Sequence, residues 1–263
     1  MIYSHQQKAI DYITDKFRYN PQVNALLISG SIAHGFNDKN SDIDIYIIVS
    51  NSLYEQKKNN NAITYWESAA HFYKEGYFDG KYITLDYLNI VAERGNEPTR
   101  FALQDSIIAF DKTGQVADCI GKIGTYDGNL IQKNTIRFLS QFEGWKWYCN
   151  EALKRKNKYL LETAVSKFIL FSGRLILLDN KIFFPYHKWF MKVLENAPQK
   201  PPKLMEAIFK LMDRKNEKTI NSLYQIIKEY KDWSDGINYN WCSYFVHDIE
   251  TVWMREEEFI ENI

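Results

Sequence analysis

The sequence has few cysteines, no excess of either charge and no long apolar run, and each shortage excludes a class of protein. Its three cysteines, Cys119, Cys149 and Cys242, are odd in number and lie far apart, without the spacing of a Cys/His metal site. We therefore expect reduced packing residues in a cytoplasmic protein. The N-terminus lacks a basic segment followed by an apolar core, and no run approaches the length of a membrane span. These absences predict a chain that is neither exported nor embedded in a membrane.

The charges of the chain balance, with 33 basic and 33 acidic residues. A balanced chain has no global positive field to hold a polyanion, so we expect no nucleic-acid partner. This argues against a template-dependent polymerase or an enzyme that extends tRNA, and a small acceptor fits better. The 263 residues, of which 45% are hydrophobic, suffice for one large or two ordinary domains.

Two apolar runs in the N-terminal quarter enclose the most informative part of the sequence. Gly30 and Ser31 directly follow the first run, and Asp42 and Asp44 open the second after a polar turn. This order predicts a strand, a glycine turn with a short helix, a loop and a second strand. Because side chains alternate along a strand, the two aspartates should project from one face, about 7 Å apart.

These residue types fit one substrate. Two neighbouring carboxylates repel each other and normally need a cation, and Mg²⁺ prefers such hard oxygen ligands and takes others from substrate phosphates. Gly30 allows the backbone to approach a ligand closely. The Ser31 hydroxyl and the N–H groups after it can hold the β- and γ-phosphates at a helix N-terminus. The segment therefore predicts a site for a nucleoside triphosphate with magnesium.

The segment resembles the signature of the DNA-polymerase-β-like nucleotidyltransferase superfamily, and within it the small-molecule branch of aminoglycoside and lincosamide nucleotidyltransferases. The matching residues are Gly30-Ser31-x-Ala33-x-Gly35 and Ser41-Asp42-Ile43-Asp44-Ile45. The resemblance implies two Mg²⁺ ions on Asp42 and Asp44. It also implies transfer of a nucleoside monophosphate, by default AMP from ATP, to a hydroxyl of a small acceptor such as an aminoglycoside-like antibiotic, with release of pyrophosphate.

A third acidic residue is expected on a neighbouring strand. Residues 81–88 are rich in β-branched and aromatic side chains and predict that strand, with Asp86 buried in its interior. In the superfamily such an acid completes the metal site or takes the proton of the acceptor hydroxyl, and the resemblance assigns this role to Asp86. An edge-strand aspartate that reaches solvent is the alternative. Residues 63–74, with Trp66 among them, are expected to be helical.

The chain divides into two predicted domains. Residues 1–126 form an α/β (α+β) nucleotidyltransferase domain with a small mixed sheet, which begins with a helix over residues 4–19. Residues 127–263 have helical periodicity throughout and predict an all-α bundle that closes the cleft. The predicted helices of the second domain cover residues 130–156, 159–178, 185–196, 202–212, 217–231 and 240–259.

Two cations interrupt the apolar second helix of the predicted bundle. Lys167 and Arg174 are seven residues apart, nearly two turns, so they lie along one line of that helix. We expect them to reach across the interdomain cleft to the triphosphate, as helical-domain cations do in relatives; internal salt bridges or snorkelling to solvent are the alternative. The roles of Tyr186, His187 and Lys188, in the acceptor or base pocket or in packing, stay open.

Two other functions need weighing. A protein-modifying nucleotidyltransferase of the antitoxin type would add AMP to a partner protein, but such antitoxins are usually a bare catalytic domain, and the long helical half argues against this class. A non-enzymatic nucleotide-binding regulator would tolerate the loss of a metal carboxylate, whereas this sequence keeps all three. We expect a monomer or a homodimer.

Overall fold

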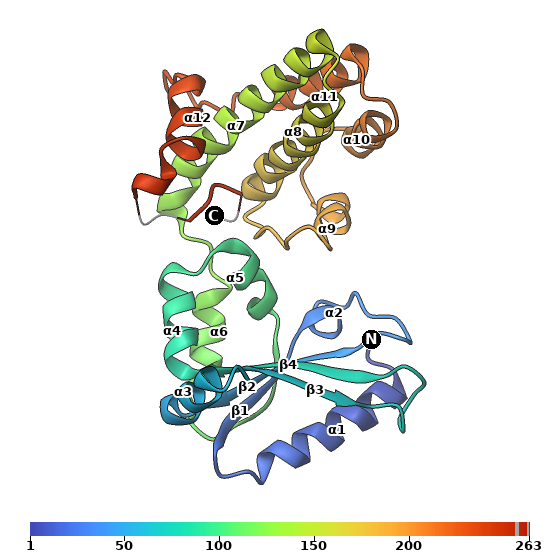
Figure 1. Cartoon of the computed structure of the whole chain (residues 1–263), viewed down its shortest axis with the longest axis vertical. Helices are drawn as coiled ribbons and strands as arrows, with labels where there is room; N and C mark the ends of the chain where they lie inside the picture. The colour runs from blue at the N-terminus through green and yellow to red at the C-terminus, as the bar shows by residue number, and fades with distance from the viewer. Residues whose placement is uncertain (256–257, 262) are drawn as a thin grey trace. The chain divides into compact units, whose positions relative to one another are not determined.

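The computed structural model describes residues 1–255, 258–261 and 263. The chain forms two compact units, residues 1–125 and 126–263 (Figure 1). The predicted boundary after residue 126 lies one residue from this division. The expected fold class, a small mixed sheet with helices followed by an all-α unit, is confirmed.

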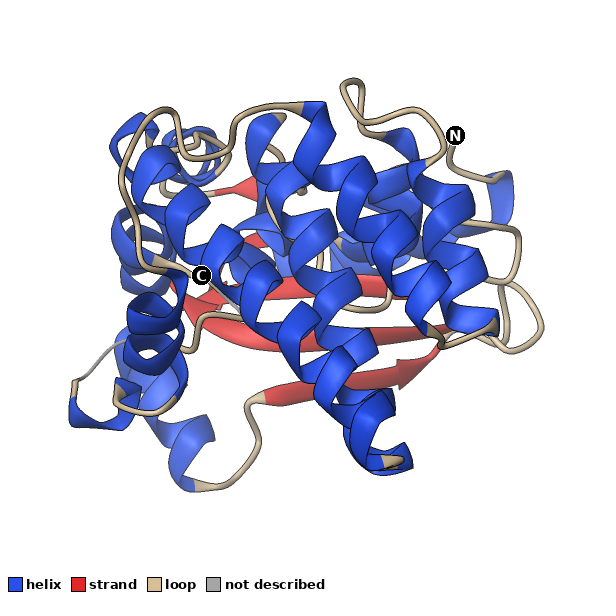
Figure 2. Ribbon diagram, turned by 90° about the horizontal axis from the view of Figure 1, so that it is seen from above, coloured by secondary structure: helices blue, strands red, loops and turns tan. Residues whose placement is uncertain are grey.

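The first unit contains a five-stranded sheet, whose strands are red in Figure 2. Its strands are β1 Val23–Ile28, β2 Ile43–Val49, β3 Thr64–Ser68, β4 Tyr77–Thr84 and β5 Ile107–Asp111. They lie in the order β3-β4-β2-β1-β5. Only the β2–β4 pairing is parallel, and the other three are antiparallel. The sheet is therefore mixed, with β3 and β5 at its edges.

One face of the sheet is covered by helix α1, Ser4–Arg18 (Figure 1). Ile43, Ile45 and Ile47 of β2 share a core with Ala9 and Ile13 of this helix. The spacing of four between Ala9 and Ile13 places both on one side of the helix, as the sequence predicts. The alternation of β2 thus directs its isoleucines to α1 and its other side chains to the opposite face.

The opposite face is covered by α4, Leu85–Arg94, α5, Glu97–Gln104, and α6, Val116–Ile123. Ile48 of β2 and Ile83 of β4 pack there against Leu88 of α4 and Val116 of α6. Tyr46 lies at the margin of this core, and the residues of β2 before it do not belong to it. The start of β2 and β4 on this face therefore has no apolar cover from these helices.

Two sequence-based expectations about this unit are wrong. Residues 64–68 form strand β3 instead of a helix, because they pair with β4 and because Glu67 binds Lys16 of α1 at 2.6 Å. The strand expected at 81–88 ends at Thr84, whose hydroxyl accepts a hydrogen bond from the Tyr87 N–H and caps α4. A threonine cap competes with strand extension by satisfying a free N–H of the helix.

The second unit is a helical bundle around α7, Gly128–Arg155, and α8, Lys158–Asp179. The other helices are α9 Phe190–Asn196, α10 Leu204–Asp213, α11 Glu217–Tyr230, α12 Trp241–Ile249 and the 3₁₀ turn Val252–Met254. A buried ion pair between Arg137 and Asp248, 2.9 Å apart, joins α7 to α12. The expected helix over 240–259 stops at Ile249, and residues 256 and 257 of that span lie outside the described residues. In the part of the chain that the structure describes, no helix has the length and apolar character needed to cross a membrane.

Candidate active site

The glycine turn and the Asp-x-Asp segment are in direct contact. Strand β1 ends at Ile28, and the one-turn helix α2 covers Gly30–Ala33. The Ser29 N–H donates to the backbone carbonyl of Asp44 at 2.9 Å. Gly30 has a φ of 60°, and a Cβ at this position would overlap the Asp44 carboxylate. Both the backbone conformation and the contact with Asp44 therefore require glycine at residue 30.

Ser31 presents an unsatisfied hydroxyl at this turn. Its side chain is buried, and its Oγ has no hydrogen-bond partner among the described residues. Leaving a buried hydroxyl unpaired costs about 1–3 kcal/mol. The first N–H groups of a helix also lack partners within the helix. A ligand oxygen such as that of a phosphate would satisfy these donors, which is the role expected of Gly30 and Ser31.

His34, in the same loop, is held by the protein. Its Nδ1 lies 3.0 Å from a carboxylate oxygen of Asp105, and its ring packs on Phe101 with centroids 4.4 Å apart. The imidazole is almost fully buried, with a side-chain exposure of 4%. These contacts connect the turn to the end of α5, so His34 supports the loop.

Three carboxylates share the uncovered part of the sheet face. Asp42 and Asp44 are half-buried, and Asp44 lies in register with Asp79 of the parallel neighbour β4. Residues in register on adjacent strands point to the same face. An acid of the neighbouring strand, Asp79, therefore faces the same way as Asp44. The sequence places this strand at residues 81–88, four residues beyond its position in the structure, so Asp79 was not expected at the site. With the strand at residues 77–84, the alternation of side chains would have placed Asp79 on this face.

Tyr77, at the start of β4, lies on the same face as these carboxylates. The pKa of Tyr77 is raised, first by a hydrogen bond to the Asp42 carboxylate, then by the charge of Asp42, by burial and by the charges of Asp79 and Asp44. One phenol thus senses all three negative charges. Among the described residues, no three His, Cys, Asp or Glu side chains are already gathered closely enough to hold a metal ion.

Comparison with known families identifies this unit. Residues 11–75 match the family described as Polymerase beta, Nucleotidyltransferase, and this span contains Gly30, Ser31, Asp42 and Asp44. The N-terminal unit thus contains a segment that matches this nucleotidyltransferase family, and it is called the nucleotidyltransferase domain below.

Residues 97–190 match a second family, described as a domain of unknown function (DUF4037). Among solved structures, a nucleotidyltransferase-like protein from Exiguobacterium sibiricum 255-15 is similar, with 10% identity and a TM-score of 0.46. The similarity covers 95% of this chain and 81% of that protein. No curated protein matches the chain.

Asp86 is not part of the acid group of the nucleotidyltransferase domain. It lies exposed in the first turn of α4, where its carboxylate accepts a hydrogen bond from Asn51 at 2.6 Å. Thr84, just before it, pairs with Val49, five residues beyond Asp44 on β2. At about 3.3 Å per residue, this places Thr84, two residues before Asp86, about 17 Å from the level of Asp44 along the strand direction. The expectation of a buried, strand-borne Asp86 is therefore wrong, and its first-turn position instead complements the helix dipole.

A hollow of about 370 Å³ lies beside the acids in the nucleotidyltransferase domain. Tyr46 and Lys81, each two residues beyond Asp44 and Asp79 on the same strands, form part of its wall, with Tyr87 of α4 and Thr99 of α5. Its size lies at the lower end of the range for small-molecule sites. Aromatic walls with a few polar atoms suit one part of an organic substrate.

Lys167 and Arg174 of α8 have partners inside the helical unit. Arg174 is 1% exposed. Its guanidinium lies between two aromatic rings, 4.3 Å from the Phe138 ring centroid and 4.6 Å from that of Phe184. It also donates hydrogen bonds to the backbone carbonyls of Glu261 and Ile263. Lys167 forms an ion pair with Glu261. Both cations thus show the internal pairing that was the alternative to a triphosphate contact.

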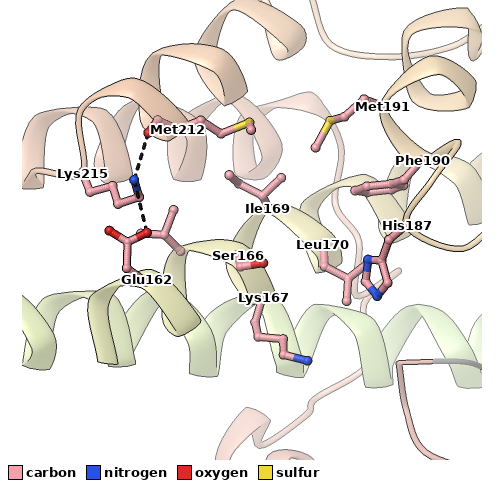
Figure 3. Close-up of a pocket in the computed structure, with 11 residues that line it drawn as sticks. Glu162, Ser166, Lys167, Ile169, Leu170, His187, Phe190, Met191, Met212 and Lys215 are labelled. Atoms are coloured by element: carbon pink, nitrogen blue, oxygen red, sulfur yellow. Dashed lines mark hydrogen bonds and ion pairs between the residues drawn. The ribbon is translucent and has the colours of Figure 1, made fainter. Parts of the chain in front are cut away.

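The helical unit has a hollow of its own, of about 320 Å³, shown in Figure 3. Lys167 and His187 lie on its wall, and Lys215 is held by Glu162 at 3.3 Å and by the Met212 carbonyl at 3.0 Å. His187 also packs edge-on against Phe184, with centroids 5.6 Å apart. Both lysines of this wall have an acidic partner within the helical unit, Lys167 in Glu261 and Lys215 in Glu162. Their charges are therefore neutralised by the protein itself.

Proposed function

We propose that this chain transfers a nucleoside monophosphate, by default AMP from ATP, to a hydroxyl of a small acceptor, with release of pyrophosphate. The observation that carries the proposal is the register of Asp44 with Asp79, together with the packing of Gly30 on Asp44. It supports a phosphate seat and three carboxylates at one end of one sheet face. An aminoglycoside-like antibiotic is one acceptor of this class.

The donor set suits a hard divalent cation. Asp42, Asp44 and Asp79 would hold magnesium, with two ions expected, because carboxylate oxygens and substrate phosphates are its preferred ligands. The fit is supported by the register that places Asp44 and Asp79 on one face, and by the unpaired Ser31 hydroxyl, which follows the Gly30 that packs on Asp44. When bound, such ions neutralise phosphate charge and lower the pKa of a coordinated hydroxyl.

The residues of the chain then have distinct tasks. Gly30 and Ser31 hold the β- and γ-phosphates and orient the α-phosphorus over Asp44. Asp79 takes the proton from the acceptor hydroxyl as its oxygen bonds to the α-phosphorus. The bond from that phosphorus to the bridging oxygen breaks on the opposite side, and the electron pair leaves with pyrophosphate. Asp79 afterwards releases the proton to solvent.

The experiment is a screen of hydroxylated antibiotics and metabolites with labelled ATP and Mg²⁺, read out as labelled product and pyrophosphate. Asp79→Asn should lower the turnover by about 10²- to 10⁴-fold, the usual contribution of a general base. Asp86→Asn is the matched control, since it removes an exposed carboxylate of the same domain, and it should keep wild-type turnover. Full activity of Asp79→Asn together with loss in Asp86→Asn would overturn the assignment of the third acid. A fully active Asp44→Asn protein would overturn the site as a whole.

A further inference from the structure

Trp66 is an exposed tryptophan next to the acids. It is the only tryptophan of residues 1–125 and is 68% exposed, on the edge strand β3. It pairs directly with Asp79 of β4, so both side chains point to the face that carries Asp44. A large apolar ring left in water on the same face as the carboxylates is a surface available to a ligand.

Tyr77 extends this apolar surface toward the acids. Its ring stacks on Trp66 with centroids 6.4 Å apart and planes 25° from parallel. Tyr77 lies two residues before Asp79 on β4, so its side chain points to the same face as the carboxylates. Trp66 and Tyr77 together form a strip, called here the aromatic platform, which runs from the edge of the sheet to the carboxylates. The alternation of β4 thus places one end of this platform on the same face as Asp79 and Asp44.

The chemistry of the transfer places the acceptor on this side of the site. The strand order β3-β4-β2-β1 puts Gly30, at the end of β1, on one side of Asp44 and puts Asp79 and Trp66 on the other. In phosphoryl transfer the attacking and leaving oxygens lie roughly in line. Since pyrophosphate leaves toward the Gly30 turn, the acceptor must approach from above β4 and β3. The aromatic platform lies on that path.

We propose that the aromatic platform binds the acceptor, and that the acceptor carries its reactive hydroxyl on or next to a ring with a flat apolar face. The inference rests on the proposed function and narrows its substrate class. Such a ring is either aromatic or the C–H face of a sugar, and both stack on indole. The nucleoside then lies away from Trp66, and the hollow beside Tyr46 and Lys81 has room for it.

The first test needs no acceptor and uses the fluorescence of Trp66. Mg-ATP is titrated into wild type, Trp66→Phe, Trp66→Ala and the control Trp253→Phe, which replaces a 79% exposed tryptophan of the helical unit. Calorimetry on the same samples should show equal Mg-ATP binding, and the emission that disappears in Trp66→Phe should not respond to the nucleotide. Quenching of that emission, or binding weakened tenfold in Trp66→Ala, would place the nucleobase on Trp66 and overturn the inference. If wild type binds no Mg-ATP, the proposed function fails, and the inference fails with it.

The second test is the kinetics of transfer to matched acceptors. Aromatic alcohols and sugars are compared with acyclic polyols, using labelled ATP. Trp66→Ala should lower kcat/KM for ring-bearing acceptors at least tenfold and change the KM for ATP less than twofold, while Trp66→Phe keeps most of the activity and Trp253→Ala all of it. A loss confined to aromatic alcohols identifies an aromatic ring, and a loss for sugars identifies a sugar face. Transfer to acyclic polyols alone, or an equal loss for all acceptors, would overturn the inference.

Discussion

The charged groups of the two units are arranged in opposite ways. In the helical unit Arg137 lies 2.9 Å from Asp248, and Arg174 is enclosed by two aromatic rings and two backbone carbonyls. In the nucleotidyltransferase domain Asp42, Asp44 and Asp79 carry the same charge and share one face. Removing one partner of a buried ion pair is costly, whereas like charges that share one face repel each other and favour the binding of a cation. The difference separates structural charges from a ligand site.

The largest effect that would sharpen this comparison is expected at Asp44. Asp44→Asn should reduce nucleotidyl transfer by roughly 10³-fold or more, the order found when a group that stabilises the transition state is removed. Its melting temperature should stay the same or rise, because a like-charge repulsion is relieved. The checks are pyrophosphate release and a melting curve with and without Mg-ATP. A marked fall in stability would mean that Asp44 contributes more to the fold through its contacts than it costs by repulsion, as the charges of the helical unit do.

The opposite pattern is expected at Asp248. Asp248→Asn leaves the buried Arg137 without its counter-charge, which costs about 3–5 kcal/mol of unfolding free energy. The affinity for Mg-ATP should not change at temperatures where the variant is folded. Urea unfolding and calorimetry give the two numbers. An unchanged unfolding free energy would mean that the buried Arg137–Asp248 pair contributes little to the stability of the helical unit.

Gly30 offers a smaller effect, which tests the contact between the two motif halves. Gly30→Ala should lower the unfolding free energy by about 1–3 kcal/mol, because residue 30 has a positive φ and a new Cβ would meet the Asp44 carboxylate. Gly121→Ala is the matched control, since no atom lies within 4 Å of its added Cβ and it is within α6. The control should gain about 0.5–1 kcal/mol. A Gly30→Ala protein as stable as the control would contradict the contact.

The pH dependence of stability should show the loss of a proton from one uncharged group in each unit, the buried Cys149 thiol and the half-buried Tyr73 phenol. Burial raises the pKa of the Cys149 thiol, and that of the Tyr73 phenol of the nucleotidyltransferase domain, to about 12 each. Both ionise at lower pH when unfolded, so the folded state holds their protons more tightly. Their contribution is fully present below the unfolded pKa values, near 9 to 10, and is lost as the pH rises toward 12. Urea midpoints between pH 8 and 11 should fall, and Cys149→Ala should fall less steeply than wild type.

The smallest effect is expected at Lys167. Its ion pair with Glu261 is partly exposed, with side-chain exposures of 26% and 30%. Such a pair contributes about 0–1 kcal/mol, and Lys167→Ala should lower stability by no more than that. Lys210→Ala, which breaks the more exposed pair with Glu206, is the control. The KM for ATP should be the same in both variants and wild type. A rise only in Lys167→Ala would return this lysine to the nucleotide site and weaken the contrast between the units.

Helix α1 and the first two strands could be read from the sequence because their signals are local. The spacing of Ala9 and Ile13 and the isoleucine alternation of β2 report directly which face is buried. The segment that contains Trp66 was predicted to be a helix, because the contacts that make it a strand are not local. Residues 64–68 become a strand by pairing with β4 and by the Glu67–Lys16 contact, and both partners are distant in sequence. Strand propensity depends on such neighbours more than helix propensity does.

The glycine turn and the Asp-x-Asp segment were determined by the sequence alone, because the conformational freedom of Gly30 and the alternation of Asp42 with Asp44 are properties of a short stretch of chain. The third carboxylate and the aromatic platform were decided only by the tertiary structure. Asp79 and Trp66 reach the site through the register of three strands, and no single segment records a register. Lys167 and Arg174 show the same dependence, because a cation's role is set by the partner that the fold brings to it.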